Sequence, residues 1–216
     1  MKSYINPNIP VLRPSDTVDD ALLLFSDFKT NHLPYVIDRS FEGFFSEDLL
    51  LNYDSDDRLT DIQPLPAEEI ILENDPLTEA VRKAAAAQIM LLPLLNADGE
   101  FMGVIEKTEL YERFIRHFAL HEVGGLLEIN LKGKDYSLAE IAKIIEGESG
   151  KIISLFITHD INNDMVLSLK LDITHISAVI SALGRFGYEV ISYHSSEPVN
   201  NLEKDRFEML MKYLSI

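Results

Sequence analysis

Two histidines in the 216-residue sequence have the spacing of a metal-binding pair. His117 and His121 stand four residues apart, which places two imidazoles on one face of a helix. The surrounding residues lack the His-Glu-x-x-His order of a zinc protease and offer no obvious third ligand. We therefore interpret the pair as part of a helix at a domain junction and not as a metal site.

A second group of polar residues resembles the start of a calcium-binding loop. Asp160, Asn162 and Asp164 have its spacing, but Met165 replaces its glycine and Leu171 its final glutamate, so we exclude calcium there. The absence of cysteine excludes disulfides, thiolate metal sites and a cysteine nucleophile. The sequence also contains no P-loop, no Gly-x-Ser-x-Gly and no Gly-x-Gly-x-x-Gly motif. We expect the chain not to be an enzyme.

The charge balance limits the partners of the protein. Thirty-six acidic and 19 basic residues give a formal net charge of −17 at pH 7. Such an excess repels phosphate backbones and anionic lipid surfaces, so we expect neither nucleic acid nor a membrane as partner. No apolar run approaches the roughly 18 residues of a membrane span, and residues 1–14 do not read as a secretory signal. These features predict a cytoplasmic protein.

The first half of the chain contains an internal repeat. Each copy opens an amphipathic helix and then reaches an apolar-Pro-apolar run, Leu33–Ile37 in the first copy and Leu92–Leu95 in the second. Ala21 to Ala80 is 59 positions, and Pro34 to Pro93 is the same number. Two landmarks at one offset indicate a repeated structural unit.

A glycine-containing strand follows the apolar run in each copy. Gly43 and Gly103 are 60 positions apart, so the intervening hairpin differs by one residue. Residues 96–99 form this hairpin in the second copy, with an Asp-Gly turn signal, and residues 38–41 hold its place in the first. Each copy predicts strand, helix, strand, turn, strand and helix. One copy alone buries too little surface, so we expect the two to pack together.

Both copies resemble the CBS domain, and the tandem resembles a CBS pair. This resemblance places the first repeat in residues 1–60 and the second in residues 61–118. CBS pairs that bind adenosine nucleotides have a Gly-x-x-Ser/Thr-x-x-Asp segment, whose hydroxyl reaches phosphate and whose carboxylate accepts from the ribose hydroxyls. The cleft residues implied here are Arg13, Pro34, Ser46, Asp48, Pro93, Glu106 and Glu109.

The match to this segment is incomplete in both copies. In the first, Ser46 fits but Leu49 takes the acidic position, with Asp48 one residue earlier. In the second, Glu106 replaces the hydroxyl residue and Glu109 takes the acidic position. A carboxylate at position 106 opposes a phosphate, which favours adenosine or S-adenosylmethionine over AMP, ADP or ATP. A divalent cation is a further candidate, but we favour a solvated acidic linker for Asp54, Asp56 and Asp57. We expect no resident cofactor or metal.

The second half changes pattern after Gly124-Gly125, which we interpret as a hinge over residues 119–125. Its predicted strands and helices alternate as βαββαβ, with strands over 126–131, 151–158, 165–171 and 188–194 and helices over 137–146 and 174–186. This order is that of a ferredoxin-like unit. Ser137 and Glu140 have capping-box spacing at the first of these helices. The overall prediction is a mixed α/β (α+β) chain.

The ferredoxin-like unit, placed over residues 126–196, resembles an ACT domain. Chains of this layout resemble the acetoin-utilisation type of CBS–ACT regulatory protein. The resemblance implies an amino-acid site in the loop that contains Asp135, Tyr136 and Ser137. The alternative interpretation of this loop is a capped turn that binds no ligand. Residues 197–216 predict a terminal amphipathic helix, with candidate packing residues Leu202, Phe207, Leu210, Met211 and Leu214.

Small side chains mark one helix of the second repeat. Ala84 and Ala87 align with Phe25 and Phe28 of the first repeat, which suggests a close approach between helices of two copies. The alternative is a strong helix former with no partner. We expect a non-catalytic cytosolic sensor, active as a homodimer, that binds an adenosine-type small molecule in the CBS cleft and relays this through the ACT-like domain. The alternative is a dimerisation or interaction scaffold with empty pockets.

Overall fold

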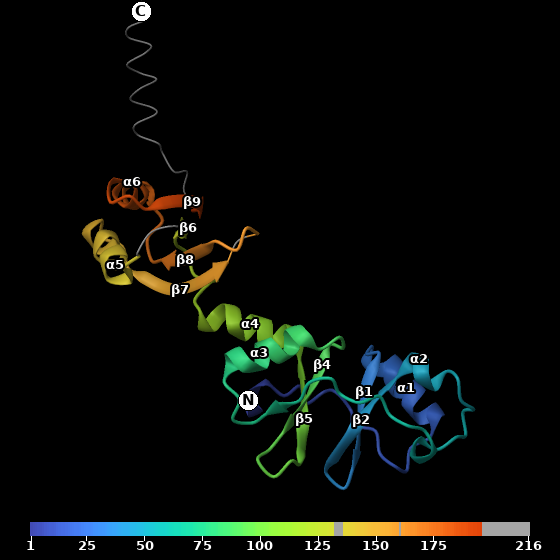
Figure 1. The fold of residues 1–216 in the computed structure, drawn as a ribbon. Helices are drawn as coiled ribbons and strands as arrows, with labels where there is room; N and C mark the ends of the chain where they lie inside the picture. Colours follow the sequence, from blue (N-terminus) through green and yellow to red (C-terminus); the bar gives the residue numbers. More distant parts are fainter. Residues whose placement is uncertain (132–135, 160, 196–216) are drawn as a thin grey trace, which may run out of the picture. The chain divides into compact units, whose positions relative to one another are not determined.

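The computed structural model describes residues 1–131, 136–159 and 161–195, and the chain divides into two compact units, Met1–Phe114 and Ile115–Ile216 (Figure 1). Among the described residues, no helix is long and apolar enough to cross a membrane. The mixed α+β class predicted from the sequence is confirmed.

The order helix, strand, strand, helix occurs twice in the first unit. The elements are η1 (Lys2–Tyr4), α1 (Val18–Phe28), β1 (His32–Ile37), β2 (Ser40–Ser46), α2 (Glu47–Leu50), η2 (Leu59–Asp61), β3 (Ile71–Leu72), α3 (Leu77–Ala86), β4 (Leu91–Leu95), β5 (Phe101–Glu106) and α4 (Lys107–His117). The short helix η1 precedes the first copy, and α4, the last helix of the second copy, ends beyond Phe114.

The two repeats form equivalent small sheets. β1 pairs antiparallel with β2, and β4 with β5. Leu12 pairs in parallel with Tyr35 of β1, as Ile71 of β3 does with Leu94 of β4, again at an offset of 59. The expected repeat is therefore present in the strand pairing as well as in the helices.

Turns of the same design introduce the first helix of each repeat. The Asp16 carboxylate accepts from the Arg13 N–H at 2.8 Å, and the equivalent Asp75 carboxylate accepts from the Leu72 N–H at 2.9 Å. Thr17 then caps α1 in a full capping box, because its hydroxyl and the side chain of Asp20 each accept from the other residue's N–H.

The segment ahead of each repeat packs on the other repeat. The Asn6 N–H donates to Val104 O of β5 at 3.0 Å, and Ile5 packs against Gly103. Leu65, 59 residues further on, exchanges two 2.8 Å backbone hydrogen bonds with Phe44 of β2. Each repeat thus completes the structure of its partner, in agreement with the expectation that one copy is too small alone.

Equivalent residues also meet each other where the repeats join. The rings of Phe41 and Phe101, 60 positions apart, stack with centroids 5.7 Å apart. Next to them Phe44, Leu91 and Val104 form a separate buried cluster. Contact between equivalent residues places a pseudo-twofold axis at this stack.

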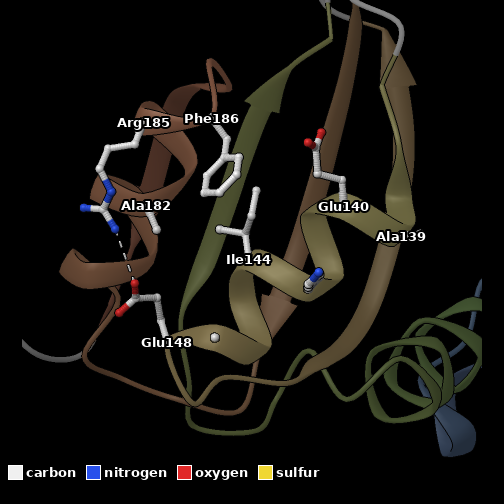
Figure 2. Close-up of a pocket in the computed structure, with 9 residues that line it drawn as sticks. Ala139, Glu140, Ile144, Glu148, Ala182, Arg185 and Phe186 are labelled. Atoms are coloured by element: carbon white, nitrogen blue, oxygen red, sulfur yellow. Dashed lines mark hydrogen bonds and ion pairs between the residues drawn. The ribbon is translucent and has the colours of Figure 1, made fainter.

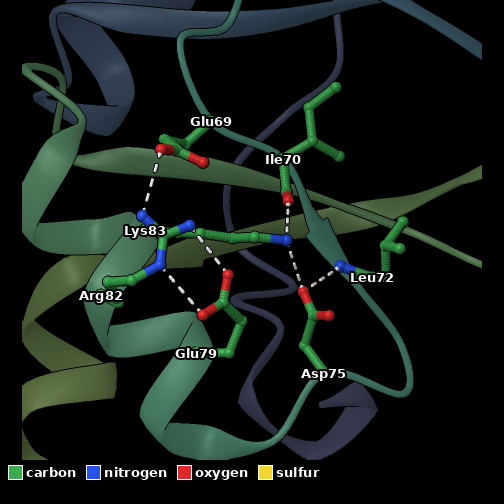
Figure 3. Close-up of polar contacts among 7 residues, drawn as sticks. All are labelled: Glu69, Ile70, Leu72, Asp75, Glu79, Arg82 and Lys83. Carbon is green, nitrogen blue, oxygen red and sulfur yellow. Dashed lines mark hydrogen bonds and ion pairs between the residues drawn. The ribbon is translucent and has the colours of Figure 1, made fainter.

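An ion-pair network joins α3 to the segment that precedes the second repeat (Figure 3). We call this segment and the one that precedes the first repeat the crossing segments. Lys83 Nζ lies 2.7 Å from the Asp75 carboxylate and 2.8 Å from the carbonyl oxygen of Ile70, and both charged side chains are 14% exposed. Arg82 beside it bonds Glu79 at 2.8 Å and reaches Glu69. Burial alone would raise the pKa of Asp75, but the hydrogen bonds from Lys83 and Leu72 outweigh it and lower the pKa.

The second unit contains a four-stranded antiparallel sheet in the order β7-β8-β6-β9, with α5 and α6 in the connections (Figure 1). This order confirms the ferredoxin-like topology. The elements are β6 (Leu126–Asn130), α5 (Leu138–Gly147), β7 (Ile152–His159), β8 (Met165–Leu171), α6 (Ser177–Arg185) and β9 (Glu189–His194).

The Gly124-Gly125 pair is buried, and the hinge over residues 119–125 stays a prediction. A Cβ on Gly124 would lie 2.1 Å from the carbonyl oxygen of Leu171, and one on Gly125 would lie 2.3 Å from the side chain of Ile176. The backbone of Gly125 also bonds Ile173 and Leu171, at 2.7 and 2.8 Å. Both glycines are present because the chain approaches the sheet closely there.

Ala84 and Ala87 lie inside the second repeat, which corrects the expected dimer interface. Ala84 is fully buried and Ala87 is 6% exposed, and both belong to the core around β4 and β5. Their methyl groups pack in the core of their own repeat. Asp135, Asp160 and the predicted terminal helix over 197–216 lie outside the described residues.

We predict that Gly43→Ala destabilises the protein more than Gly103→Ala. Both residues have a φ of +149°. The new Cβ at position 43 would lie 2.5 Å from the backbone oxygen of Leu65, whereas at position 103 it would lie 2.5 Å from the Cγ2 atom of the Ile5 side chain, which can move more easily than backbone. We expect a loss of about 3 kcal/mol at position 43 and about 1–2 kcal/mol at position 103, measured by urea denaturation.

Gly99→Ala is the matched control, because its φ is +80° and no atom lies within 4 Å of the new Cβ. It reports the backbone strain alone. Equal losses at positions 43 and 103 would contradict the different contacts assigned to the two crossing segments.

The Asp75–Lys83 pair predicts a pH-dependent contribution to stability. Because the pKa of Asp75 is lowered by folding, the contribution is present above the ordinary carboxyl pKa of about 4 and is lost as the pH falls further. We expect Asp75→Asn to cost about 1 kcal/mol at pH 7 and progressively less below about pH 4 in chemical denaturation. Asp98→Asn, in an exposed turn, is the control. A cost that is unchanged at low pH would contradict the pair.

Candidate functional site

Two cavities of the first unit border Glu106, and the larger of these two lies where the repeats meet. Its volume is about 800 Å³, within the range of small-molecule sites. The junction between α1 and β1 contributes Phe28–His32, and the junction between α3 and β4 contributes Gln88–Leu91. Residues 88–91 are the equivalents of residues 29–32 at the offset of 59, so a ligand here contacts the same structural position in both repeats.

Basic and polar groups from the first repeat line one wall of this cavity. Lys29 ends α1 in a left-handed conformation with φ of +50°, and Thr30, Asn31 and His32 follow it. Burial lowers the pKa of His32, and the Asp48 carboxylate acts in the opposite direction. A neutral imidazole at pH 7 can gain a proton when an anion binds beside it.

A smaller cavity of about 320 Å³ lies beside the start of α4. It is lined by η1 and the following residues on one side and by Glu106, Thr108, Glu109 and Glu112 on the other. Its carboxylates favour hydroxyl donors or cations over phosphate. Glu106 lines both cavities, so we call the two together the cleft.

The structure engages both carboxylates implied by the CBS resemblance. The side-chain amide of Asn6 donates to Glu106, and the hydroxyl of Thr108 donates to its other oxygen at 3.3 Å. Glu109 pairs with Arg113 at 2.6 Å across one helical turn. Arg113 in turn lies over the ring of Tyr4, 5.2 Å from its centroid.

The first-repeat residues implied by the resemblance lie differently. Ser46 is 9% exposed and caps α2, because its Oγ accepts from the Leu49 N–H at 3.2 Å. Asp48 is exposed on α2 and close enough to His32 to affect its pKa. Neither residue is among those that line the two cavities.

Arg13, Pro34 and Pro93 also lie outside the lining of the two cavities. Arg13 is exposed in the turn before α1, and the two prolines are buried within β1 and β4. Of the residues predicted for the cleft, the structure therefore brings together Glu106 and Glu109.

Lys107, a further basic residue at the start of α4, does not face the cleft. It is 7% exposed, and its ammonium group donates to the carbonyl of Ala87 at the end of α3. A cation at this position complements the negative end of the α3 dipole.

In the second unit, Ser137 caps α5 by accepting from the Glu140 N–H at 3.3 Å. The side chain of Glu140 does not complete the expected capping box, because it accepts from the Tyr188 hydroxyl at 2.5 Å. Tyr136 packs against the core of the unit. An amino-acid ligand at this loop stays a prediction.

Sequence reasoning missed the junction residues Lys29–His32 and Gln88–Met90, and it missed Asn6. A signal was present in the repeat itself, since both junctions directly precede the apolar-Pro-apolar run. The contact of Asn6 with Glu106 had no signal, because it depends on the crossing of the N-terminal segment to the other repeat.

Comparison with known families agrees with this geometry. The model of the CBS domain family matches residues 1–56. The first repeat matches the CBS domain. The second repeat has the same order of elements and the same crossed contacts, which supports a tandem of CBS repeats. No curated protein sequence matches the chain.

Several solved structures are similar to part of the chain. A CBS domain pair/ACT domain protein from Thermotoga maritima is 22% identical, with a TM-score of 0.49, and the match covers 54% of this chain and 96% of that one. CBSX2 from Arabidopsis thaliana is 22% identical, with a TM-score of 0.46 and coverage of 54% and 94%. CBSX2 has also been solved in complex with AMP, with 23% identity, a TM-score of 0.45 and coverage of 54% and 96%.

Because Ser46 caps α2, we expect Ser46→Ala to cost about 1 kcal/mol of unfolding free energy in the absence of any ligand. Ser46→Thr keeps the acceptor oxygen and should restore most of this loss. Ser40→Ala, at an exposed position of β2, is the control. Urea denaturation of the three variants measures the effect, and an unchanged stability of Ser46→Ala would exclude the cap.

Proposed function

We propose that the protein is a non-catalytic regulatory module that binds an adenosine-type small molecule in the cleft. The supporting observation is the cavity of about 800 Å³ bordered by equivalent junctions of both CBS repeats. A ligand that touches both repeats can shift their arrangement, provided that it binds the two arrangements with different affinity.

The chemistry of the cleft supports a nucleoside with a polar substituent. Glu106 offers a carboxylate to ribose hydroxyls at the boundary of the two cavities, and an adenine ring fits against Ile89 and Leu91 in the larger one. Lys29 and His32 face the same cavity and suit one phosphate group. Because Glu106 opposes dense negative charge, AMP or S-adenosylmethionine fits this cleft better than ATP.

We further propose that the protein acts in the cytoplasm as a homodimer and that the ACT-like unit relays the binding event. No interface between copies is assigned to named residues, because Ala84 and Ala87 are buried. A cytoplasmic site is consistent with the acidic charge and the absence of cysteine.

One observation favours a second function, that of an interaction scaffold with an empty cleft. Asn6, Leu49 and Arg113 already bond the Glu106, Ser46 and Glu109 groups that a nucleotide would address. A ligand must compete with these internal partners.

Thermal unfolding with AMP, ADP, ATP, S-adenosylmethionine, magnesium and amino acids tests the proposal. Ligand at about a hundred times its Kd stabilises the folded state by roughly 2.7 kcal/mol, which raises the Tm by several degrees. We expect this shift with at least one adenosine compound. We expect Glu106→Ala to weaken its binding about tenfold, because a charged acceptor of the ribose hydroxyls is lost.

Asp27→Ala is the matched control, since it removes one exposed carboxylate of α1 outside the two cavities and changes the net charge equally. It should leave the shift unchanged. A shift with amino acids alone would move the site to the second unit, and no shift with any compound would favour the scaffold. Either result would overturn the adenosine proposal.

A further inference from the structure

A groove runs between α5 and α6 in the second unit, on the side of these helices away from the sheet (Figure 2). Its volume is about 570 Å³. Ala139, Ile144, Gly147, Ala182 and Phe186 give it an apolar floor with small side chains on both helices. Phe186 is 55% exposed, so a large aromatic surface is presented at the edge of the groove.

The spacing of the floor residues suits a third helix. Ala139 and Gly147 lie two intervals of four apart on α5, and Ala182 of α6 and its C-cap Phe186 are one such interval apart. Rows of this spacing are the ridges and grooves through which helices pack. Small residues in such a row allow another backbone to approach.

Charged residues of both signs form the rim of the groove. Arg185 of α6 bonds Glu148 at the end of α5 at 3.5 Å, and this ion pair crosses one end of the groove (Figure 2). Glu140 and Lys143 stand on the α5 side. A partner with an apolar stripe flanked by acidic and basic residues matches this rim.

The sequence of the chain itself contains such a segment. Residues 201–216 place Phe207, Leu210, Met211 and Leu214 at intervals of three and four, with Lys204, Arg206 and Glu208 beside them in sequence. We propose that this segment forms an amphipathic helix that docks in the groove between α5 and α6.

The position of the chain before the segment supports this occupant. The hydroxyl of Ser195 donates to the carbonyl of Thr174 at 2.5 Å, which holds the chain beside the start of α6. The five residues 196–200 can span up to about 17 Å when extended. A helix of 16 residues would be about 24 Å long, more than the length of the ten-residue α5.

The short tether decides between this segment and a second copy of the chain. A flexible connection of a few residues gives an effective concentration in the millimolar range. A free copy at ordinary concentrations cannot compete with it. Docking within one chain is therefore the favoured state.

Paramagnetic labelling of the full-length protein tests the docking, since the native chain has no cysteine to interfere. A nitroxide is attached in turn at Ser181→Cys, exposed on α6 beside the groove, and at Ser192→Cys, exposed on β9. Ser192 pairs with Glu128, so it lies on the sheet face opposite the helices. We expect the label at 181 to broaden the NMR signals of residues 204–214 and the label at 192 to leave them sharp.

Two disruptive variants and one conservative control show whether the apolar contact is responsible. Phe207→Ser with Leu210→Ser, in the segment, and Phe186→Ser, at the groove, should each remove the broadening, and Phe186→Leu should retain it. The two disruptive variants should also speed amide hydrogen exchange in residues 204–214 about tenfold, because the segment loses its buried face. Phe186→Leu should leave this exchange rate unchanged.

Three results would overturn the proposal. Broadening from the label at 192 would place the segment on the open face of the sheet. No broadening from either label would mean that the groove is empty or takes a small molecule. Broadening seen only when labelled and isotope-enriched chains are mixed would mean that the segment docks on a second copy.

Discussion

The exchange of segments between the two repeats is the constraint on which the first unit depends. Asn6 donates one backbone hydrogen bond to Val104 of β5, and Leu65 forms a β-bridge with Phe44 of β2, so each repeat binds the segment that precedes the other. Each repeat has a glycine, Gly43 or Gly103, at the point where the segment that precedes the other repeat passes over its strand. The repeat offset of about 59 residues is preserved in these contacts, so the two sets of contacts are structurally equivalent.

The same exchange creates the cleft and gives it its charge. By crossing over, the N-terminal segment brings Asn6 to Glu106 and Tyr4 beneath Arg113, next to the carboxylates of α4. The junctions at Lys29–His32 and Gln88–Leu91 meet on the other side of Glu106. One side of the cleft is thus acidic and the other carries the basic groups.

The repeat, the order of elements and the α+β class could be predicted from the sequence because they follow from local apolar patterns and a fixed offset. The strand Met165–Leu171 was predicted with its exact bounds. The burial of Gly124-Gly125 and of Ala84 and Ala87 could not be predicted, because it depends on which distant backbone passes nearby. In a sequence, small residues look the same whether they form a hinge, an interface between copies or a close contact between two segments of the chain.

The candidate site shows the same division. Glu106 and Glu109 were found through the resemblance of their spacing to a nucleotide-binding segment, and both border the smaller cavity. Lys29 and His32 were missed, because the repeat pattern marks where a junction is but not that two junctions face one cavity. The Glu140 side chain was expected to complete the capping box with Ser137, but it accepts a hydrogen bond from the Tyr188 hydroxyl, 48 residues away. Such a tertiary contact has no signal in the local sequence.

Hydrogen-exchange mass spectrometry with and without an adenosine compound tests the central claim most directly. The account predicts slower exchange in both Phe28–His32 and Gln88–Leu91 when AMP or S-adenosylmethionine is bound, because the ligand contacts the equivalent junction of each repeat. Protection in one junction alone, or confined to the second unit, would contradict a ligand that bridges the two CBS repeats.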